Sequence, residues 1–291
     1  MTKLAYAAFV ILGLIWGTNF LFMKWAASLL TPSQIVLLRV LFGFAPILLL
    51  AVVRRALRWS QLKDIPHFMV MALLATVFYY YAFAADTALL PSGIAGMLAG
   101  AIPLFSFVTA WFFMREEPLN FLTMSGLCMG FAGILCIAQP WQVQGGIDLH
   151  GVLYMIAGSL SVGSSFIYAR RYLSPKGYSA LALSSWQTGL ALLLLLIMTD
   201  LDGIHAIRQD PRALTGLVFG LGLLGTGVAY VLYYFIIQHL GALRAAGVSY
   251  IPPVVALIMG HLLADEPFHA IHLLAVTLIL GGVYLLQTGK Q

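Results

Sequence analysis

The chain has 291 residues, of which 62% are hydrophobic and only 9% are charged, against about 25% charged residues in an ordinary soluble domain. With a mean hydropathy of +0.97, it has too little polar surface to fold in water, which predicts an integral membrane protein. The net charge of +5 therefore does not indicate a nucleic-acid-binding protein, because basic residues in a membrane protein mainly report its topology.

Ten stretches are long and apolar enough to cross a bilayer, which takes about 20 residues of helix. They lie at 4–24, 33–53, 67–86, 92–114, 120–138, 150–169, 180–199, 212–236, 243–263 and 269–287. The connections are short, so most of the protein is predicted to lie within the membrane. The predicted fold class is therefore an all-α integral membrane protein with ten transmembrane helices.

Lysine and arginine residues concentrate on one side of these spans. The side of the N-terminus holds Lys3, Arg54, Arg55, Arg58, Lys63, Arg115, Arg170, Arg171, Lys176, Arg244 and Lys290. The other side holds only Lys24, Arg208 and Arg212. Because cytoplasmic loops carry the excess of basic residues, both termini are predicted to be cytoplasmic.

The two halves of the chain resemble each other, which predicts a first five-helix repeat at 1–140 and a second at 141–291. An offset of 146 residues aligns Gly17 with Gly163, Phe20 with Phe166 and Gly43 with Gly189. Further along, an offset of 149 residues aligns Tyr81 with Tyr230, Pro103 with Pro252, Glu117 with Glu266 and Pro118 with Pro267. Since five is odd, the second repeat must enter the membrane from the opposite face. Inverted repeats of this kind are typical of secondary transporters.

Acidic residues followed by proline precede the fifth and the tenth span. The first turn reads REEPLN, residues 115–120, and the second reads ADEPFH, residues 264–269. Proline is tolerated at the first helical position, and carboxylates before it suit the free N–H groups and the dipole of a helix start. We interpret these acids as helix-start devices rather than as proton sites or catalytic groups: Glu116, Glu117, Asp265 and Glu266.

Together these features resemble the drug/metabolite transporter superfamily, and most of all its EamA-type exporters. The resemblance rests on the ten spans, the two repeats, the segment GLIWGTNF in the first span and the acidic turns. Within this family the chain looks most like the bacterial amino-acid exporters, which carry aromatic amino acids, methionine or threonine. The resemblance implies a multi-pass protein of the bacterial inner membrane. It also implies that spans three, four, eight and nine surround a central cavity, with spans five and ten at the periphery.

Prolines interrupt two of the spans that would surround this cavity. Pro103 lies near the middle of the fourth span, and Pro252 with Pro253 near the middle of the ninth. A proline inside a helix removes a backbone hydrogen bond and kinks the helix. We interpret the matched positions as a pair of gating hinges, and simple structural kinks remain the alternative.

Tyrosines and small polar residues supply the candidate lining of the cavity. Tyr81 and Tyr230 are favoured, because they match across the repeats and lie well inside their spans. Aromatic walls suit a solute with an apolar or aromatic side chain, and hydroxyl groups orient its polar ends. The alternative for each residue is core packing or interhelical hydrogen bonding. The candidate substrate-binding residues are Trp16, Asn19, Tyr79, Tyr81, Pro103, Ser165, Trp186, Tyr230, Tyr234, Tyr250 and Pro252.

Charged residues within the spans are scarce. Arg39 lies about two turns into the second span, and Asp86 ends the third span on the same side. The two form a candidate ion pair in an outer gate, and the alternative is that Arg39 extends to the lipid headgroups. No buried proton relay stands out, which favours facilitated transport or exchange.

The predicted function is export of small metabolites, most of all amino acids with aromatic or other apolar side chains, by alternating access. The alternatives are export of another metabolite or drug, such as a nucleoside, a sugar or a toxic compound, and a channel or lipid scramblase. An enzyme is not expected, since the histidines are scattered near the span ends and make no metal site. No cofactor is expected, the partners are the solute and the bilayer with no nucleic acid, and no oligomer is required.

Overall fold

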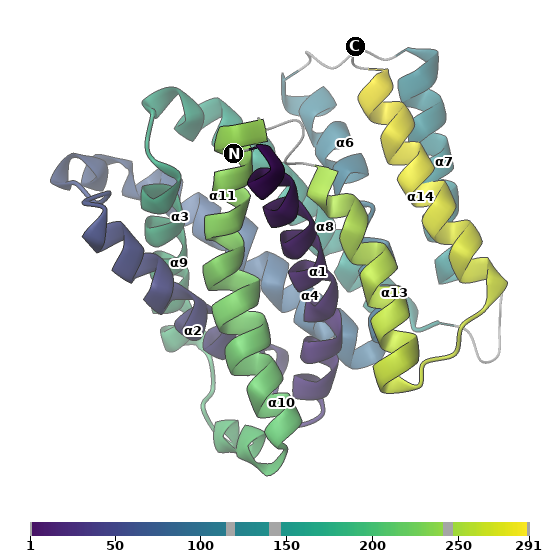
Figure 1. Cartoon of the computed structure of the whole chain (residues 1–291), viewed down its shortest axis with the longest axis horizontal. Coiled ribbons are helices and arrows are strands. Elements are labelled where there is room, and N and C mark those ends of the chain that lie inside the picture. Colours follow the sequence, from purple (N-terminus) through teal and green to yellow (C-terminus); the bar gives the residue numbers. More distant parts are fainter. Residues whose placement is uncertain (1, 115–119, 140–146, 241–246, 290–291) are drawn as a thin grey trace.

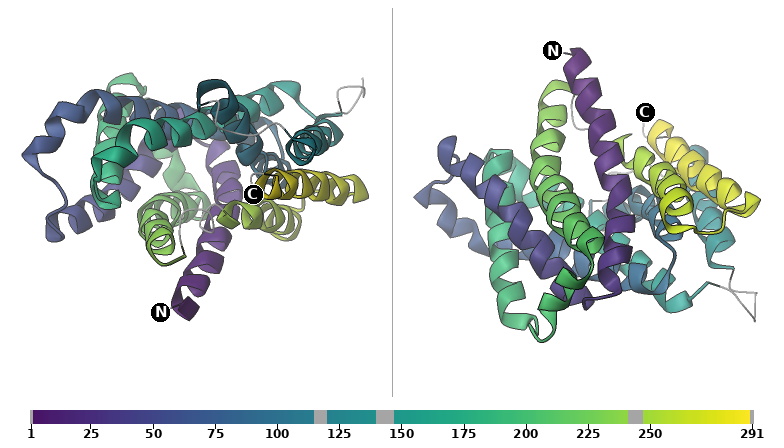
Figure 2. Two further views of the ribbon diagram at one scale, coloured as in Figure 1. Left: turned by 90° about the horizontal axis from the view of Figure 1, so that it is seen from above. Right: turned by 60° about the horizontal axis from the view of Figure 1, so that its bottom comes forward.

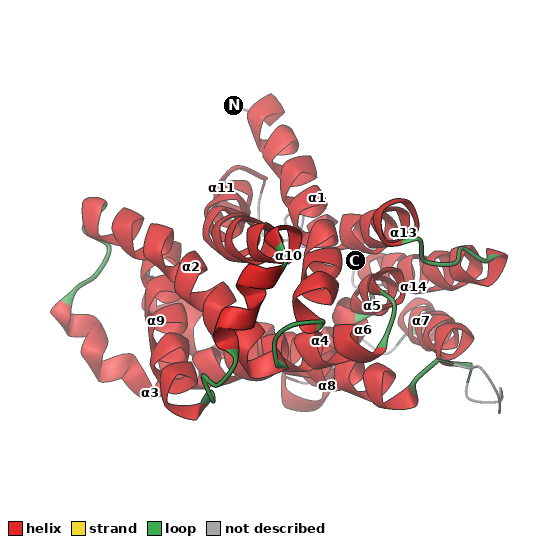
Figure 3. Cartoon of the chain, turned by 90° about the horizontal axis from the view of Figure 1, so that it is seen from below, coloured by secondary structure: helices red, strands yellow, loops and turns green. Residues whose placement is uncertain are grey.

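The protein is an α-helical bundle in the computed structural model, which describes residues 2–114, 120–139, 147–240 and 247–289. Across these ranges the chain forms helices joined by short loops and no strand (Figure 3). Nine of the described helices are long and apolar enough to cross a membrane, and Val248–Ala264 is a shorter apolar helix. The chain is therefore a multi-pass integral membrane protein, as predicted.

The first half contains five helical spans. Its first two helices are continuous, α1 (Thr2–Ala27) and α2 (Pro32–Val53). The third span is built from η1 (Trp59–Asp64), α3 (Ile65–Ala72), the π-helical turn η2 (Leu73–Val77) and α4 (Phe78–Leu89). The fourth consists of α5 (Ser92–Ala99) and α6 (Ile102–Met114), and the fifth is α7 (Phe121–Ala138).

The second half repeats this order of spans. Its sixth span is α8 (Leu149–Tyr168), extended by η3 (Ala169–Leu173) and η4 (Ser174–Lys176), and its seventh is α9 (Ala180–Met198). After η5 (Ile204–Gln209), the eighth span comprises α10 (Pro211–Thr215), the π-helical η6 (Gly216–Val228) and α11 (Ala229–Leu240). The ninth is η7 (Gly247–Tyr250) with α13 (Ile251–Ala264), and the tenth is α14 (Ala270–Thr288).

Local sequence signals begin several of these helices. Thr31 caps α2: its hydroxyl accepts from the backbone N–H of Gln34, and the Gln34 side chain accepts from the N–H of Thr31. Pro32 occupies the first helical position, where a missing N–H has no cost. The side chains of Asp148 and Ser179 cap α8 and α9 in the same manner.

Helices α7 and α14 lie together at one edge of the bundle (Figure 1), as the family resemblance implied for spans five and ten. Glycine permits their close approach: a Cβ atom on Gly282 would lie 2.5 Å from the carbonyl oxygen of Gly126. Close crossings over small residues are typical of membrane helices, which gain stability from packing rather than from exclusion of water.

The long, tilted α1 runs through the middle of the bundle, between α11 on one side and α13 on the other (Figures 1 and 2). The start of α1 and the end of α14 lie at the same end of the bundle (Figure 1), which we call the terminal face. The other end, where α13 turns into α14, is the opposite face.

Candidate substrate-binding site

A buried arginine organises the polar interior of the bundle. Arg39 of α2 is only 4% exposed. Its Nε atom donates to the Thr226 hydroxyl at 3.2 Å, and its Nη2 atom donates to the carbonyl oxygen of Gly225 at 3.5 Å. The guanidinium carbon lies 3.8 Å from the ring centroid of Tyr80, where the aromatic face attracts a cation. The second, third and eighth spans therefore meet at this side chain.

Asn19 of α1 completes this group. In the amide orientation that satisfies both of its polar atoms, the Asn19 oxygen accepts from Arg39 Nη2 at 3.1 Å. Its nitrogen then donates to the carbonyl oxygen of Ile15, also at 3.1 Å. We call Asn19, Arg39, Tyr80, Gly225 and Thr226 the Arg39 cluster.

The backbone of η6 explains why this cluster forms at the eighth span. The segment Gly216–Val228 is wound in wider, π-helical turns, which occur often at functional sites. The Thr226 hydroxyl donates to the carbonyl oxygen of Leu221 at 2.9 Å, while the carbonyl of Gly225 accepts from Arg39. A side chain at Gly225 would displace Asn19, because its Cβ atom would lie 2.5 Å from the Asn19 amide.

A second set of polar side chains lies one helical turn away from the Arg39 cluster. Gln187 of α9 donates from Nε2 to the Thr76 hydroxyl at 2.9 Å and to the Tyr230 hydroxyl at 3.4 Å. Thr76 precedes Tyr80 by about one turn, and Tyr230 follows Thr226 by one turn, so these residues are neighbours along their helices. Polar side chains thus connect the first, second, third, seventh and eighth spans.

The expected ion pair between Arg39 and Asp86 is wrong. Among the described residues, the ion pairs are His150 with Asp148 and Lys176 with Asp64, so no carboxylate faces Arg39. The guanidinium points toward η6 and the ring of Tyr80, and the Arg39 side chain does not extend to the headgroups either. Arg39 is therefore a buried cation with neutral partners.

Asp86 is also buried, although it lies at the end of the third span, as expected. Its residue is 0% exposed, and neither carboxyl oxygen has a hydrogen-bond partner in the described part of the chain. The half-buried Lys24 of α1 donates instead to the carbonyl oxygen of Leu90 at 3.0 Å. The third span thus carries a carboxyl group into the interior without pairing it.

Glu266 bridges the two halves at the opposite face. Its carboxylate accepts from the backbone N–H of Ser92 at 2.5 Å and from that of Gly93 at 2.8 Å, at the first turn of α5. The helix-start interpretation was thus right in chemistry but wrong about the helix, because Glu266 caps the fourth span and not the tenth. Gly260 makes room for it: a Cβ atom there would lie 2.3 Å from Glu266 Oε2. We call this contact the Glu266 bridge.

Asp265 is the other acid of the second turn. Asp265 ends α13 in a left-handed conformation, with φ of 51°. Glu116 and Glu117 lie outside the described residues.

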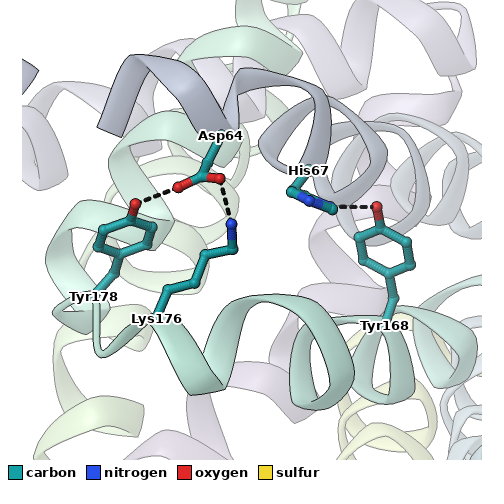
Figure 4. Close-up of polar contacts among 5 residues, drawn as sticks. All are labelled: Asp64, His67, Tyr168, Lys176 and Tyr178. Carbon is teal, nitrogen blue, oxygen red and sulfur yellow. Dashed lines mark hydrogen bonds and ion pairs between the residues drawn. The ribbon is translucent and has the colours of Figure 1, made fainter. Parts of the chain in front are cut away.

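A second contact between the halves lies at the terminal face. Asp64, which is 4% exposed, pairs with Lys176 and accepts from the hydroxyl of Tyr178 (Figure 4). This hydrogen bond to a carboxylate raises the pKa of Tyr178. His67 contacts the Tyr168 hydroxyl at 2.8 Å beside this pair. We call the contact of Asp64 with Lys176 and Tyr178 the Asp64 bridge. Because the Asp64 bridge and the Glu266 bridge are both formed, the two halves are joined at each face.

Three of the other predicted site residues have packing or structural partners. Trp16 packs on Tyr233, with ring centroids 5.8 Å apart. Trp186 donates from Nε1 to Gln61 at 2.8 Å and stacks on Phe68. Ser165 donates within its own helix to the carbonyl oxygen of Val162 at 2.7 Å. These contacts agree with the packing alternative, whereas Asn19 and Tyr230 belong to the polar interior.

The tyrosines of the third span divide by orientation. Tyr80 is 5% exposed and faces Arg39, while Tyr81 is 39% exposed. Tyr80, and not the favoured Tyr81, therefore belongs to the Arg39 cluster. Tyr79 is half-buried against Phe83, with ring centroids 4.4 Å apart.

Two further predicted tyrosines belong to the eighth and ninth spans. The hydroxyl of Tyr250 is buried, with no hydrogen-bond partner among the described residues. The side chain of Tyr234 lies outside the described part of the structure.

The prolines mark breaks that meet each other. The fourth span is interrupted at Gly100 and Ala101, just before Pro103 in α6. Pro252 lies in the first turn of α13 after a 3-10 turn, rather than in the middle of a continuous helix as expected. A Cβ atom on Gly100 would lie 2.8 Å from Pro253 Cγ. The interruption of the fourth span therefore packs against the start of α13 in the ninth span.

Two hollows lie near the ends of the bundle. One, of about 540 Å³, opens at the opposite face and is lined by residues that include Leu90, Asp148, His261, Glu266, His269 and His272. The other, of about 550 Å³, runs along α1, α10 and η6, beside Phe22 and Phe219. Neither takes residues from all four spans expected to surround a central cavity. No group of three or more potential metal ligands gathers within the described ranges.

Comparison with known proteins places the chain in a family. The model of the EamA-like transporter family matches residues 3–139 and 149–288. The inner membrane transporter YedA of Escherichia coli K12 is 25% identical, over 98% of this chain and 91% of its own. YoaV of Bacillus subtilis is 25% identical, over 94% and 92%, and a transporter of Archaeoglobus fulgidus is 22% identical, over 93% and 94%; all three are named uncharacterized transporters.

A solved crystal structure has the same fold. It superposes with a TM-score of 0.63 at 19% identity, over 97% of this chain and 96% of that one. The ten apolar helices and the match to the family model over both halves lead to one conclusion. The chain belongs to the EamA-like transporter family.

Proposed function

We propose that this transporter exports small solutes that carry a carboxylate, namely amino acids with aromatic or other apolar side chains. The observation that carries the proposal is Arg39, a cation at 4% exposure that contacts neutral groups alone among the described residues. An ionisable residue inside a membrane protein is costly and usually marks a substrate pathway. A substrate carboxylate is the counterion that such a cation lacks.

The surroundings of Arg39 suit the remainder of an amino acid. Arginine presents a planar fork of donors that matches a carboxylate with two parallel hydrogen bonds. Tyr79, Tyr80 and Phe83 offer aromatic surface for an apolar side chain. The ring centroid of Tyr79 lies 4.9 Å from that of Tyr80 and 4.4 Å from that of Phe83. The hydroxyls of Thr76 and Tyr230 offer acceptors for an amino group. A nucleoside or sugar has no group that would use the charge of Arg39.

The proposed transport cycle alternates between the two faces. The repeats at 1–140 and 141–291 would rock about the interior, with the Asp64 bridge opening at the terminal face and the Glu266 bridge at the opposite face. The distribution of lysine and arginine supports cytoplasmic termini, so that the terminal face is the cytoplasmic one. The name of the YedA relative supports the bacterial inner membrane as the location.

A flux assay with the purified protein in proteoliposomes tests the substrate class. Vesicles would be loaded with labelled phenylalanine, leucine, methionine, threonine, adenosine or glucose, and release would be followed against empty vesicles. We expect the apolar amino acids to move and adenosine and glucose to stay. Movement of the nucleoside or the sugar with no movement of any amino acid would overturn the proposed substrate.

A further inference from the structure

The most unusual group that the proposed function leaves unused is the carboxyl of Asp86. It lies in the last turn of α4, and it is 0% exposed. Neither of its oxygens has a hydrogen-bond partner in the described part of the chain. A buried, unpaired carboxylate is among the costliest groups that a protein interior can hold, and it escapes that cost by binding a proton.

The helices packed on α4 bring few charged groups toward Asp86. They are α1, α2, α5 and α8. Lys24 of α1 is the charged group whose field reaches Asp86, but its ammonium binds the carbonyl of Leu90. The guanidinium of Arg39 of α2 donates to Thr226 within the Arg39 cluster, and α5 carries no ionisable side chain.

The remaining titratable groups near α4, within the described ranges, also leave Asp86 without a partner. Asp148 and His150, at the start of α8, are exposed and pair with each other. Tyr79 and Tyr80, on α4 itself, pack against each other and against Phe83 and Arg39. The surroundings therefore fit a neutral, protonated Asp86 in this closed arrangement.

The path for a proton between Asp86 and the water at the opposite face is short. Leu90, one turn beyond Asp86, lines the hollow of about 540 Å³ that opens there. Its backbone N–H donates to the carbonyl oxygen of Asp86 at 2.8 Å, so the two residues belong to one helix end. A small separation of α4 from α1 would expose the carboxyl to water from that hollow.

We propose that Asp86 carries one proton through the membrane in each transport cycle, which makes this protein a solute/proton antiporter. The carboxyl takes its proton from water at the opposite face, holds it while both bridges are closed, and releases it to water at the terminal face. After release, the carboxylate is stabilised by the ammonium of Lys24, which leaves the Leu90 carbonyl. This replaces the facilitated transport that the sequence favoured. It rests on transport by this family, and not on which solute is moved.

Infrared spectroscopy of the purified protein tests the protonation of Asp86 without any solute. At neutral pH we expect the carbonyl band of a protonated carboxylic acid, absent from Asp86→Asn and retained in the matched control Asp202→Asn, whose residue is exposed at the opposite face. Absence of the band from the wild type, or its presence in Asp86→Asn, would overturn the proposal. If the amide variant does not fold, Asp86→Glu must shift the band.

Flux across a pH gradient tests the coupling. For each variant, the release of labelled phenylalanine is measured with and without a gradient that is acidic on the side to which the solute moves. We expect a ratio of the two rates above one for the wild type and Asp202→Asn, and a ratio of one for Asp86→Asn. A wild-type ratio of one, or an unchanged ratio in Asp86→Asn, would contradict proton carriage.

The two proposals fail separately in these assays. If the wild type does not move phenylalanine, the proposed substrate class fails for that amino acid. The ratio is then measured with whichever solute of the panel does move, and the infrared band still decides whether Asp86 holds a proton.

Discussion

Arg39 and Asp86 are both buried in the first half of the chain, but their surroundings differ completely. Arg39 has a threonine hydroxyl, an asparagine oxygen, a backbone carbonyl and an aromatic face as partners, whereas Asp86 has no hydrogen-bond partner among the described residues. The difference follows from chemistry. A guanidinium group stays charged in a protein, so its site must supply permanent partners, whereas a carboxyl group can become neutral by taking up a proton.

This contrast separates the two groups in function. A permanent buried cation is suited to a permanent anion, such as the carboxylate of a substrate. A carboxyl group with no fixed partner is suited to a proton, which it can gain and lose as its surroundings open. The predictions below test whether the two residues behave as differently as their surroundings.

The largest effect is expected from loss of the positive charge at Arg39. Arg39→Gln should weaken amino-acid binding by about 2–5 kcal/mol, the usual cost of removing one member of a buried charge pair, which is roughly thirtyfold or more in affinity. Arg39→Lys should retain part of the affinity, because it keeps the charge and loses the planar fork. Competition against labelled phenylalanine in detergent measures both variants. Equal affinity of Arg39→Gln and the wild type would place the substrate elsewhere.

Substitutions of Arg39 and Asp86 should differ in their effect on the free energy of unfolding. Arg39→Met leaves the Gly225 carbonyl and the Asn19 oxygen without their donor, at a cost of about 1–3 kcal/mol for each group. Asp86→Asn should change the free energy of unfolding by less than about 1 kcal/mol, because the amide has the shape of the protonated acid and breaks no hydrogen bond. Thermal unfolding in one detergent compares them. A larger loss in Asp86→Asn would show that the carboxyl has a partner that stabilises it.

The Glu266 bridge should weaken on addition of a single methyl group. Gly260→Ala places a Cβ atom where only 2.3 Å separates it from Glu266 Oε2, so the carboxylate must leave the first turn of α5. We expect Ser92→Cys, in a background without Cys128 and Cys136, to react faster with a water-soluble thiol reagent when Gly260→Ala is present. Gly281→Ala is the control, because its Cβ meets only the tip of Met129, a flexible side chain. An equal labelling rate in both would mean that Glu266 does not close this face.

The smallest effect is expected at the Asp64 bridge. Tyr178→Phe should cost less than about 1 kcal/mol, because one hydrogen bond is lost at a partly exposed site. The pKa of Tyr178 is raised above its ordinary value of 10.0, so its contribution is present at neutral pH and is lost as the pH rises above that value. The melting temperatures of the variant and the wild type should therefore converge in alkaline buffer. A constant difference across that range would argue against the hydrogen bond to Asp64.

Much of the fold was predictable, because hydropathy alone sets the ends of membrane helices. The second span, expected at 33–53, is observed at Pro32–Val53, and the tenth, expected at 269–287, is observed at Ala270–Thr288. Arg39 also stood out, since a charge is rare inside an apolar span. Its partners Gly225 and Thr226 were not predictable, because they belong to the eighth span and depend on the π-helical winding of η6.

The preference for Tyr81 rested on its match with Tyr230 across the repeats, and such a match does not show which tyrosine faces Arg39. Three consecutive tyrosines carry no pattern of their own, and the π-helical turn at Leu73–Val77 changes the phase of the helix that follows. Glu266 shows a different limit, since its partners Ser92 and Gly93 belong to the other half of the chain and no local rule identifies them. The burial of Asp86 at the end of its span was not predictable either, because it depends on the neighbouring helices and not on the position in the span.

A matched pair of ligands tests the role of Arg39 most directly. Phenylalanine and its carboxamide have the same ring and the same amino group, and they differ in the carboxylate that Arg39 is proposed to bind. We predict that the wild type binds the acid far more tightly than the amide, and that Arg39→Gln binds the two with similar weak affinity. An equal preference for the acid in the wild type and in Arg39→Gln would contradict the account.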